Sequence, residues 1–103
     1  MKKLSVAIPT YNKCHSINYF LETHLEVFQK KGIKIYIFNN SSSDGTKEVL
    51  ATWLKRCDQI KLYEGTGEPL TYDDSARYII EKVEEDYVWL VGDTYYLNPS
   101  LIE

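Results

Sequence analysis

Apolar and polar residues follow one another in blocks along this chain of 103 residues, and the blocks have two different periods. Short runs rich in β-branched and aromatic residues predict four buried strands, and apolar residues at every third or fourth position between them predict three helices. The expected strands are 4–8, ended by Pro9, and then 33–38, 60–63 and 87–91. The expected helices run from about Ser16 to Lys30, from a cap at Ser43 or Asp44 to Cys57, and through a stripe formed by Ala76, Ile79, Ile80 and Val83.

Strands that alternate with helices predict an α/β fold, a Rossmann-like parallel sheet with right-handed crossovers and helices on its faces. Near the end of the chain, Asn98 followed by Pro99 is typical of a helix start. We therefore expect residues 1–103 to be a partial domain, truncated where a further helix begins. The exposed edge of such a sheet would favour self-association.

Composition excludes several classes of protein. Lys and Arg number 12 against 15 Asp and Glu, a net charge of −3, so the basic surplus of a nucleic-acid-binding protein is missing. No apolar run approaches the roughly 18–20 residues that a membrane span requires. The first residues lead straight into a strand and not into a signal peptide, so the cytoplasm is the expected location, with peripheral association at the inner membrane face left open. Cys14 and Cys57 are 43 residues apart in the sequence and are expected to be free thiols.

The motifs of several enzyme classes are weak here. The first strand-to-helix turn has no glycine, so a dinucleotide pyrophosphate could not approach its backbone closely. Gly65 and Gly67 follow a strand but lead into Glu68 and Pro69, which favours a loop. With His15 and His24 as the two histidines, a nucleophile–histidine arrangement is poorly supported, and His24 lies on an apolar helical stripe where packing is expected.

Polar residues gather at one end of the predicted strands. The segments 10–12, 39–45, 64–72 and 92–96 follow the strands and are rich in hydrogen-bonding groups, whereas the opposite turns, 30–32, 58–59 and 84–86, are plain charged turns. Ligands of open parallel sheets bind outside the carboxyl ends of the strands. The pattern predicts a binding site on this rim without naming its ligand, although each segment also has a purely structural explanation as a turn or a cap.

Three blocks of sequence resemble the family 2 glycosyltransferases, which have the GT-A fold. Residues 5–12 (Ser-Val-Ala-Ile-Pro-Thr-Tyr-Asn) are similar to the opening strand and loop of that family. Residues 37–46, ending Ser-Asp-Gly-Thr, resemble its Asp-rich second block, and 87–93 followed by Asn98 and Pro99 resemble the strand before its metal-binding Asp-x-Asp segment. The blocks occur in the family's order across almost the whole chain.

The resemblance implies a nucleotide-sugar site. It assigns the base-holding loop to Pro9, Thr10, Tyr11 and Asn12, with Tyr11 stacked on uracil or a related base. The family's base-recognising Asp corresponds to Asn39, whose amide can still bond a uracil edge because it carries both a donor and an acceptor. Asp73, Asp74 and Arg77 lie near the family's base- or phosphate-contacting positions. Their charges have a second explanation at the start of a helix.

The resemblance also implies a divalent metal, Mn²⁺ or Mg²⁺, that neutralises the diphosphate leaving group. This chain departs from the family there, because Asp93 is followed by Thr94, Tyr95 and Tyr96 instead of further acidic residues. We therefore expect Asp93 to hold the metal weakly.

The implied activity is transfer of a sugar from a nucleotide-diphospho-sugar, a UDP-sugar, to a glycan or lipid-linked acceptor. The acceptor surface and the catalytic base would lie beyond residue 103, so no catalytic residue is assigned and the chain alone is expected to be inactive. The alternative is a degenerate, non-catalytic nucleotide-binding or assembly module, which Asn39 and the missing acidic residues favour. A nucleotidyltransferase is weaker, because the loop at 10–13 is not the Gly-rich basic loop that such enzymes use.

Overall fold

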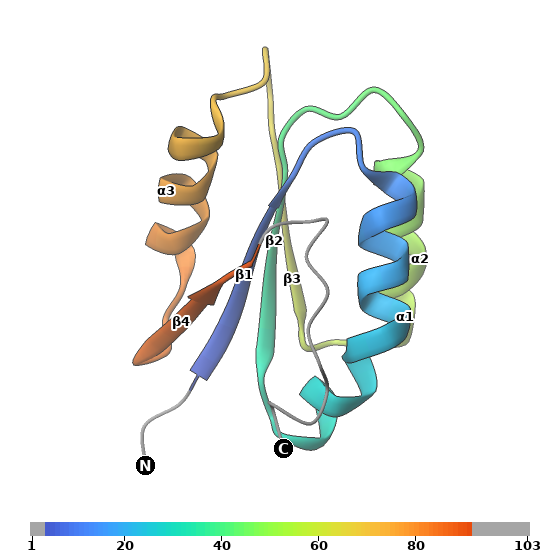
Figure 1. Ribbon diagram of the computed structural model, residues 1–103, viewed down its shortest axis with the longest axis vertical. Coiled ribbons are helices and arrows are strands. Elements are labelled where there is room, and N and C mark those ends of the chain that lie inside the picture. The colour runs from blue at the N-terminus through green and yellow to red at the C-terminus, as the bar shows by residue number, and fades with distance from the viewer. Residues whose placement is uncertain (1–3, 92–103) are drawn as a thin grey trace.

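Four strands form one sheet in the order β3-β2-β1-β4, with all neighbouring strands parallel. The computed structural model describes residues 4–91. Helices alternate with strands through this range, which confirms the expected α/β class (Figure 1). The elements are β1 (Leu4–Thr10), α1 (Cys14–Lys30), β2 (Lys34–Asn39), α2 (Thr46–Arg56), β3 (Ile60–Glu64), α3 (Tyr72–Lys82) and β4 (Tyr87–Leu90).

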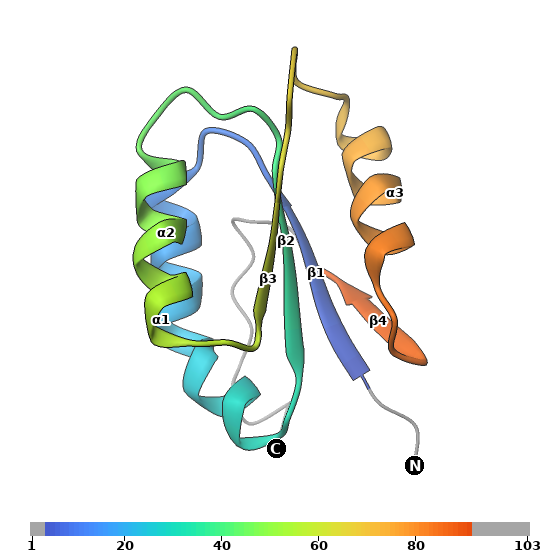
Figure 2. The same ribbon diagram turned by 180° about the vertical axis from the view of Figure 1, so that it is seen from behind.

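Helices cover both faces of the sheet. Helices α1 and α2 lie side by side on one face, and α3 lies alone on the other, as the views from the front and from behind both show (Figures 1 and 2). Successive strand residues point to opposite faces, so Ile8 joins the larger buried cluster, which also holds Phe28 of α1 and Leu50 of α2. Its neighbour Ala7 joins the smaller cluster with Ile79 of α3.

Pro9 does not end the first strand, contrary to the sequence expectation. Strand β1 continues through Pro9 to Thr10, and Pro9 pairs in register with Phe38 of β2. Strand β4 pairs with β1 as far as Ala7, whose carbonyl accepts a bond of 2.9 Å from the N–H of Val91. Because alternate peptide groups face opposite neighbours, Pro9 faces the β4 side beyond that last described pair. The missing N–H of proline therefore costs none of the ladder bonds between β1 and β2.

The helix ends differ from expectation by a few residues. Helix α1 begins at Cys14, two residues early. Gly45 is the N-cap residue of α2, so neither of the two expected caps occupies that position. The carboxylate of Asp44 nevertheless accepts a bond from the N–H of Thr46, the first residue of the helix, at 3.0 Å. It therefore supplies the expected capping interaction from one position earlier.

Most buried residues agree with the sequence, but β4 does not: its first and last residues are exposed and the two between them are half-buried, although a buried strand was expected there. His24 is fully buried on α1 between Phe20 and Phe28, with ring centroids 4.7 and 6.2 Å away, as its apolar stripe predicts. Burial lowers the pKa of His24 from its ordinary value. Cys57 is buried, and both cysteines are free thiols, as expected. Ile80, expected in the core stripe of α3, is instead 39% exposed.

The turn at 84–86 is not a plain charged turn, because the side chain of Glu85 forms hydrogen bonds with residues of β1 and β2. Its Oε1 atom accepts hydrogen bonds from the hydroxyls of Tyr36 at 2.8 Å and Ser5 at 2.9 Å, and its Oε2 atom lies 3.4 Å from Lys34 Nζ. Burial together with the bond to Glu85 raises the pKa of Tyr36 to about 12. Burial opposes ionisation of Glu85, but the bonds donated by Tyr36 and Ser5 outweigh it and lower its pKa. This cluster anchors the end of the sheet opposite the polar rim.

No helix among residues 4–91 is long and apolar enough to cross a membrane.

Candidate functional site

Three of the four polar segments predicted to meet at one rim, 10–12, 39–45 and 64–72, do so in the structure, while the fourth, 92–96, lies outside the described residues. Because the strands are parallel, the loops that follow β1, β2 and β3 leave the sheet at the same edge. Backbone bonds tie them together, since the N–H of Asn40 donates to the carbonyl of Thr10 at 2.9 Å and the N–H of Gly65 donates to the carbonyl of Asn39 at 2.8 Å. The rim is therefore one connected surface.

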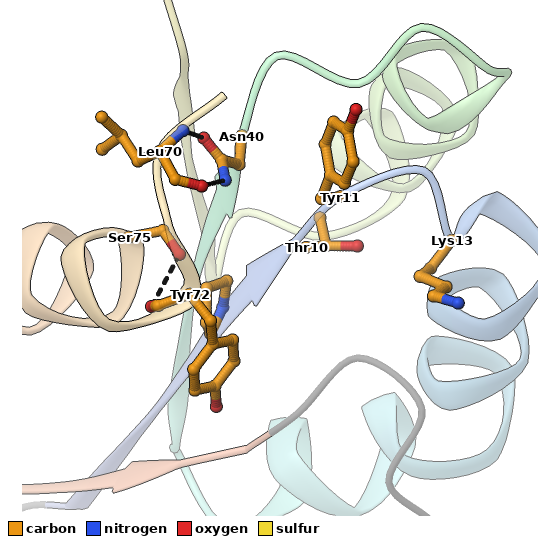
Figure 3. Close-up of a pocket in the computed structure, with 8 residues that line it drawn as sticks. Thr10, Tyr11, Lys13, Asn40, Leu70, Tyr72 and Ser75 are labelled. Atoms are coloured by element: carbon orange, nitrogen blue, oxygen red, sulfur yellow. Dashed lines mark hydrogen bonds between the residues drawn. The ribbon is translucent and has the colours of Figure 1, made fainter. Parts of the chain in front are cut away.

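A cavity of about 270 Å³ opens on this rim at the ends of β1 and β2 (Figure 3). Among the lining residues that the structure describes, Lys13 is the one charged side chain. Tyr11 rises from the end of β1 on one side, and α3 contributes the other side (Figure 3). The residues that line it are Pro9, Thr10, Tyr11, Lys13, Asn40, Leu70, Tyr72 and Ser75.

Three of the sequence-predicted residues, Pro9, Thr10 and Tyr11, lie on this cavity. The two strand residues are buried, whereas Tyr11 is 45% exposed at the mouth. Tyr11 directly follows the last residue of β1, and an exposed tyrosine ring is suited to stacking against a planar ligand. The cavity also contains residues that sequence reasoning missed, chiefly Asn40 and Tyr72.

Asn40 joins the loop before α3 to the end of β2. Its amide accepts a bond of 2.8 Å from the N–H of Leu70 and donates one of 2.9 Å to the carbonyl of Leu70, the pair of dashed lines in Figure 3. The side chain thus imitates the pairing of a neighbouring strand. The period of two along β2 places Asn40 with Phe38 on the α3 face and Asn39 on the opposite face. That alternation was the available sequence signal for its place on the cavity.

Asn12, a predicted nucleotide-binding residue, connects two loops of the rim. Its Oδ1 atom accepts bonds from the backbone N–H groups of Ser43 at 2.7 Å and Asp44 at 3.3 Å. Its own N–H donates to the hydroxyl of Ser42 at 2.9 Å, and its φ of 49° lies in the left-handed region that asparagine tolerates. The structure therefore gives the side chain a bracing role, and contact with a nucleotide stays a prediction.

Asp44 connects the loop after β2 to the first residues of both α1 and α2. One carboxylate oxygen accepts from the N–H of Cys14, the first residue of α1, at 3.2 Å, and the other accepts from the N–H and the hydroxyl of Thr46 at the start of α2. A carboxylate is stabilised there by the positive ends of the two helix dipoles. The hydrogen bond from the Thr46 hydroxyl is the largest cause that lowers the pKa of Asp44.

Asn39 is buried at the end of β2, with 2% of its surface exposed. Its Nδ2 atom donates to Oε2 of Glu64 at 3.0 Å, and Glu64 is its register partner on β3. A carboxylate accepts hydrogen bonds and cannot donate them, so this contact fixes which end of the amide faces it. The Oδ1 atom of Asn39 has no hydrogen-bond partner among residues 4–91.

The other predicted contacts, Asp74 and Arg77, lie on α3 outside the lining of the cavity. Both residues are exposed. The backbone N–H of Asp74 donates to the Thr71 hydroxyl at 3.2 Å, which caps the helix, and Asp73 and Asp74 form its acidic first turn. The structure thus agrees with their explanation as helix-start charge, and their contact with a nucleotide stays a prediction.

A second cavity, of about 280 Å³, lies on the far side of the Asn40–Leu70 pair, along the ends of β2 and β3. Both Asn40 and Leu70 line the two cavities. Two acidic residues, Glu64 and Glu68, belong to its lining. The rim therefore has a basic side chain in one cavity and acidic ones in the next.

Metal ligands do not gather in the part of the chain that the structure describes: within 4–91, no three His, Cys, Asp or Glu side chains form a candidate metal site. Asp93, the predicted ligand, lies outside the described residues, and so do Asn98 and Pro99. The donor set for Mn²⁺ or Mg²⁺ thus stays a prediction from the sequence, and no chemical step is derived through it.

An open parallel sheet with a polar, hollowed rim at the carboxyl ends of its strands defines a ligand-binding α/β domain. Comparison with known families is more specific. The chain belongs to glycosyl transferase family 2, whose family model matches residues 5–103. This confirms the resemblance found in the three sequence blocks.

Solved structures confirm the fold. The mannosyltransferase PcManGT from Pyrobaculum calidifontis, in complex with GDP-Man and Mn²⁺, has a TM-score of 0.81 and 17% identity over 98% of this chain and 30% of its own. S. aureus TarS 1-349 has a TM-score of 0.75 and 17% identity, over 97% of this chain and 30% of its own. The same TarS fragment in complex with UDP-GlcNAc has a TM-score of 0.66 and 18% identity, over 97% of this chain and 29% of its own. The chain thus spans about 30% of the length of these structures. A search of curated proteins gave no match.

Proposed function

We propose that this chain is the donor-binding part of a glycosyltransferase that moves a sugar from a nucleotide-diphospho-sugar, a UDP-sugar, to a glycan or lipid-linked acceptor. The observation that carries the proposal is the cavity at the end of β1, where Pro9, Thr10 and Tyr11 of the family's opening block lie together. Nucleotide sugars are also present in solved structures of this fold, GDP-Man in one and UDP-GlcNAc in another.

The geometry suggests how the two halves of such a donor would be bound. The exposed ring of Tyr11 offers a stacking surface for the base. Lys13 lies on the same cavity next to the first residue of α1. A cationic side chain beside a helix N-terminus favours a negatively charged group, and the diphosphate is the anionic part of the donor. The chain would therefore bind and orient the donor, with the acceptor surface, the catalytic base and the metal ligand Asp93 assigned outside residues 4–91.

Calorimetric titration of the chain with UDP, with and without Mn²⁺, tests the proposal, and ADP serves as the control nucleotide. We expect UDP to bind and Tyr11→Ala to weaken it about 5- to 150-fold, because base–aromatic stacking contributes about 1–3 kcal/mol. Tyr19→Ala is the matched control, since Tyr19 is 57% exposed on α1 and lies outside both rim cavities. Enhancement by Mn²⁺ would support the metal role of Asp93.

Two outcomes would count against the proposal. A folded chain that binds no UDP has no working donor site and favours the degenerate module. UDP binding that Tyr11→Ala leaves intact, or that Tyr19→Ala weakens equally, places the nucleotide away from the cavity at the end of β1.

A further inference from the structure

Asn39 and Glu64, on neighbouring strands, form a pair that presents only hydrogen-bond acceptors. The amide nitrogen of Asn39 is occupied by Oε2 of Glu64 at 3.0 Å. What is left is Oδ1 of Asn39, which has no hydrogen-bond partner among residues 4–91, and the second carboxylate oxygen of the exposed Glu64. Neither atom can donate a hydrogen bond while the pair is formed.

The two residues are held firmly at the rim. They are register partners at the ends of β2 and β3, and the next peptide along β3 is also fixed, because the N–H of Gly65 bonds the carbonyl of Asn39 at 2.8 Å. Asn39 is buried, whereas Glu64 is exposed and lines the second cavity. A buried amide oxygen without a donor costs about 1–3 kcal/mol. A ligand that brings a donor to this pair would recover that free energy.

We infer that Glu64 is a specificity-determining residue: it orients the Asn39 amide and, with it, selects a nucleoside diphosphate whose base carries a ring N–H. This inference rests on the proposed donor site and adds the selection rule. Uracil and guanine present a donor at that ring nitrogen, whereas cytosine and adenine present an acceptor. A pair that presents only acceptors therefore binds the ring N–H of uracil or guanine. It repels the acceptor nitrogen of cytosine or adenine and leaves that nitrogen without a hydrogen bond.

The charge of the rim agrees with this orientation. The cavity that contains Lys13 suits the diphosphate, while the cavity that contains Glu64 and Glu68 repels it. A nucleotide lying along the rim would therefore place its base, and not its phosphates, toward the strand ends that carry Asn39 and Glu64.

The test compares the affinities of UDP and CDP, two pyrimidine nucleotides that differ at the base edge, by calorimetry on the full chain. We expect UDP to bind about tenfold or more tightly than CDP. In Glu64→Gln one end of the new amide still accepts from Asn39, and the other end becomes an N–H donor that fits cytosine. The UDP-to-CDP affinity ratio should then fall by about tenfold or more, with CDP binding itself strengthened.

Glu68→Gln is the matched control, because Glu68 lines the same cavity and carries the same charge, whereas the amide of Asn39 donates its hydrogen bond to Glu64. It should leave the ratio unchanged. A Glu64→Gln chain that folds like the parent in urea titration and keeps the parent's ratio would overturn the role of Glu64 while leaving the donor site standing. Binding of neither nucleotide to the folded parent chain would overturn the donor site itself and this inference with it.

Discussion

Of the four glycines that the structure describes, Gly65 has the least room for a side chain, so Gly65→Ala is a direct test of how tightly the loops after β2 and β3 are joined. A Cβ atom there would lie 2.4 Å from the Ser41 hydroxyl oxygen, 2.9 Å from the Ser41 backbone nitrogen and 3.3 Å from the Asn39 carbonyl oxygen. The Ser41 hydroxyl can rotate away, but the Ser41 backbone nitrogen cannot, because its N–H donates a hydrogen bond of 2.8 Å to the Asn39 carbonyl. The loop must therefore shift as a unit.

Overpacking of this kind costs about 1–3 kcal/mol of unfolding free energy. In a domain of this size each kcal/mol corresponds to a fall in Tm of roughly 4–8 °C. Urea titration followed by tryptophan fluorescence measures the loss. Gly67→Ala is the matched control, since no atom lies within 4 Å of its added Cβ, and it should be neutral or stabilising by about 0.4–1 kcal/mol. If Gly65→Ala proves as stable as Gly67→Ala, the close contact between the two loops is not formed in solution.

Two further predictions concern titratable groups away from the rim. Burial lowers the pKa of His24, so the unfolded chain binds a proton more readily than the folded one. The free energy of unfolding should therefore fall as the pH drops below about 6.5, the pKa of an unperturbed histidine. Urea titrations at several pH values measure this dependence on pH, which should be weaker in His24→Leu. Tyr36→Phe removes the hydroxyl that donates to Glu85 and should cost about 1.5–3 kcal/mol near neutral pH, because the acceptor is a carboxylate. Since the folded pKa of Tyr36 is about 12 and the unfolded value about 10, the parent should also lose stability as the pH rises from about 10, and Tyr36→Phe should lose less.

The control for Tyr36→Phe is a tyrosine on the surface. Tyr72→Phe should leave stability unchanged, because its side chain is 56% exposed. An acid slope that persists in His24→Leu, or a Tyr36→Phe chain as stable as the parent, would contradict the respective explanation.

The sequence predicted the elements well because strands and helices have different apolar periods. The errors fall where tertiary context decides. Pro9 continues a strand because its missing N–H faces away from β2, the strand with which it pairs, and this orientation depends on a pairing register that no local pattern contains. Ile80 continues an apolar stripe on α3 yet is exposed, because the smaller buried cluster beneath that helix does not extend to it.

The candidate site was predicted in position more than in detail. The parallel order placed the polar loops on one rim, and the family resemblance named Tyr11, which lines the cavity. The resemblance also directed attention to Asn39, while the alternation of β2 places its neighbour Asn40 on the cavity instead. The contact between Asn39 and Glu64 depends on the pairing register of two strands, which the sequence does not specify.

The unequal covering of the two sheet faces has a consequence for local opening. Among residues 4–91, the larger cluster, on the face covered by α1 and α2, contains fifteen buried residues, whereas the smaller one, on the α3 face, contains four. Segments that bury less apolar surface open at lower free energy. One wall of the rim cavity, formed by Tyr72 and Ser75, belongs to α3, and the opposite wall belongs to the β1 end and the α1 start. We therefore expect the α3 side of the cavity to open locally at lower free energy than the α1 side. Slower amide hydrogen exchange in α1 than in α3 would show that the width of the site changes through movement of α3.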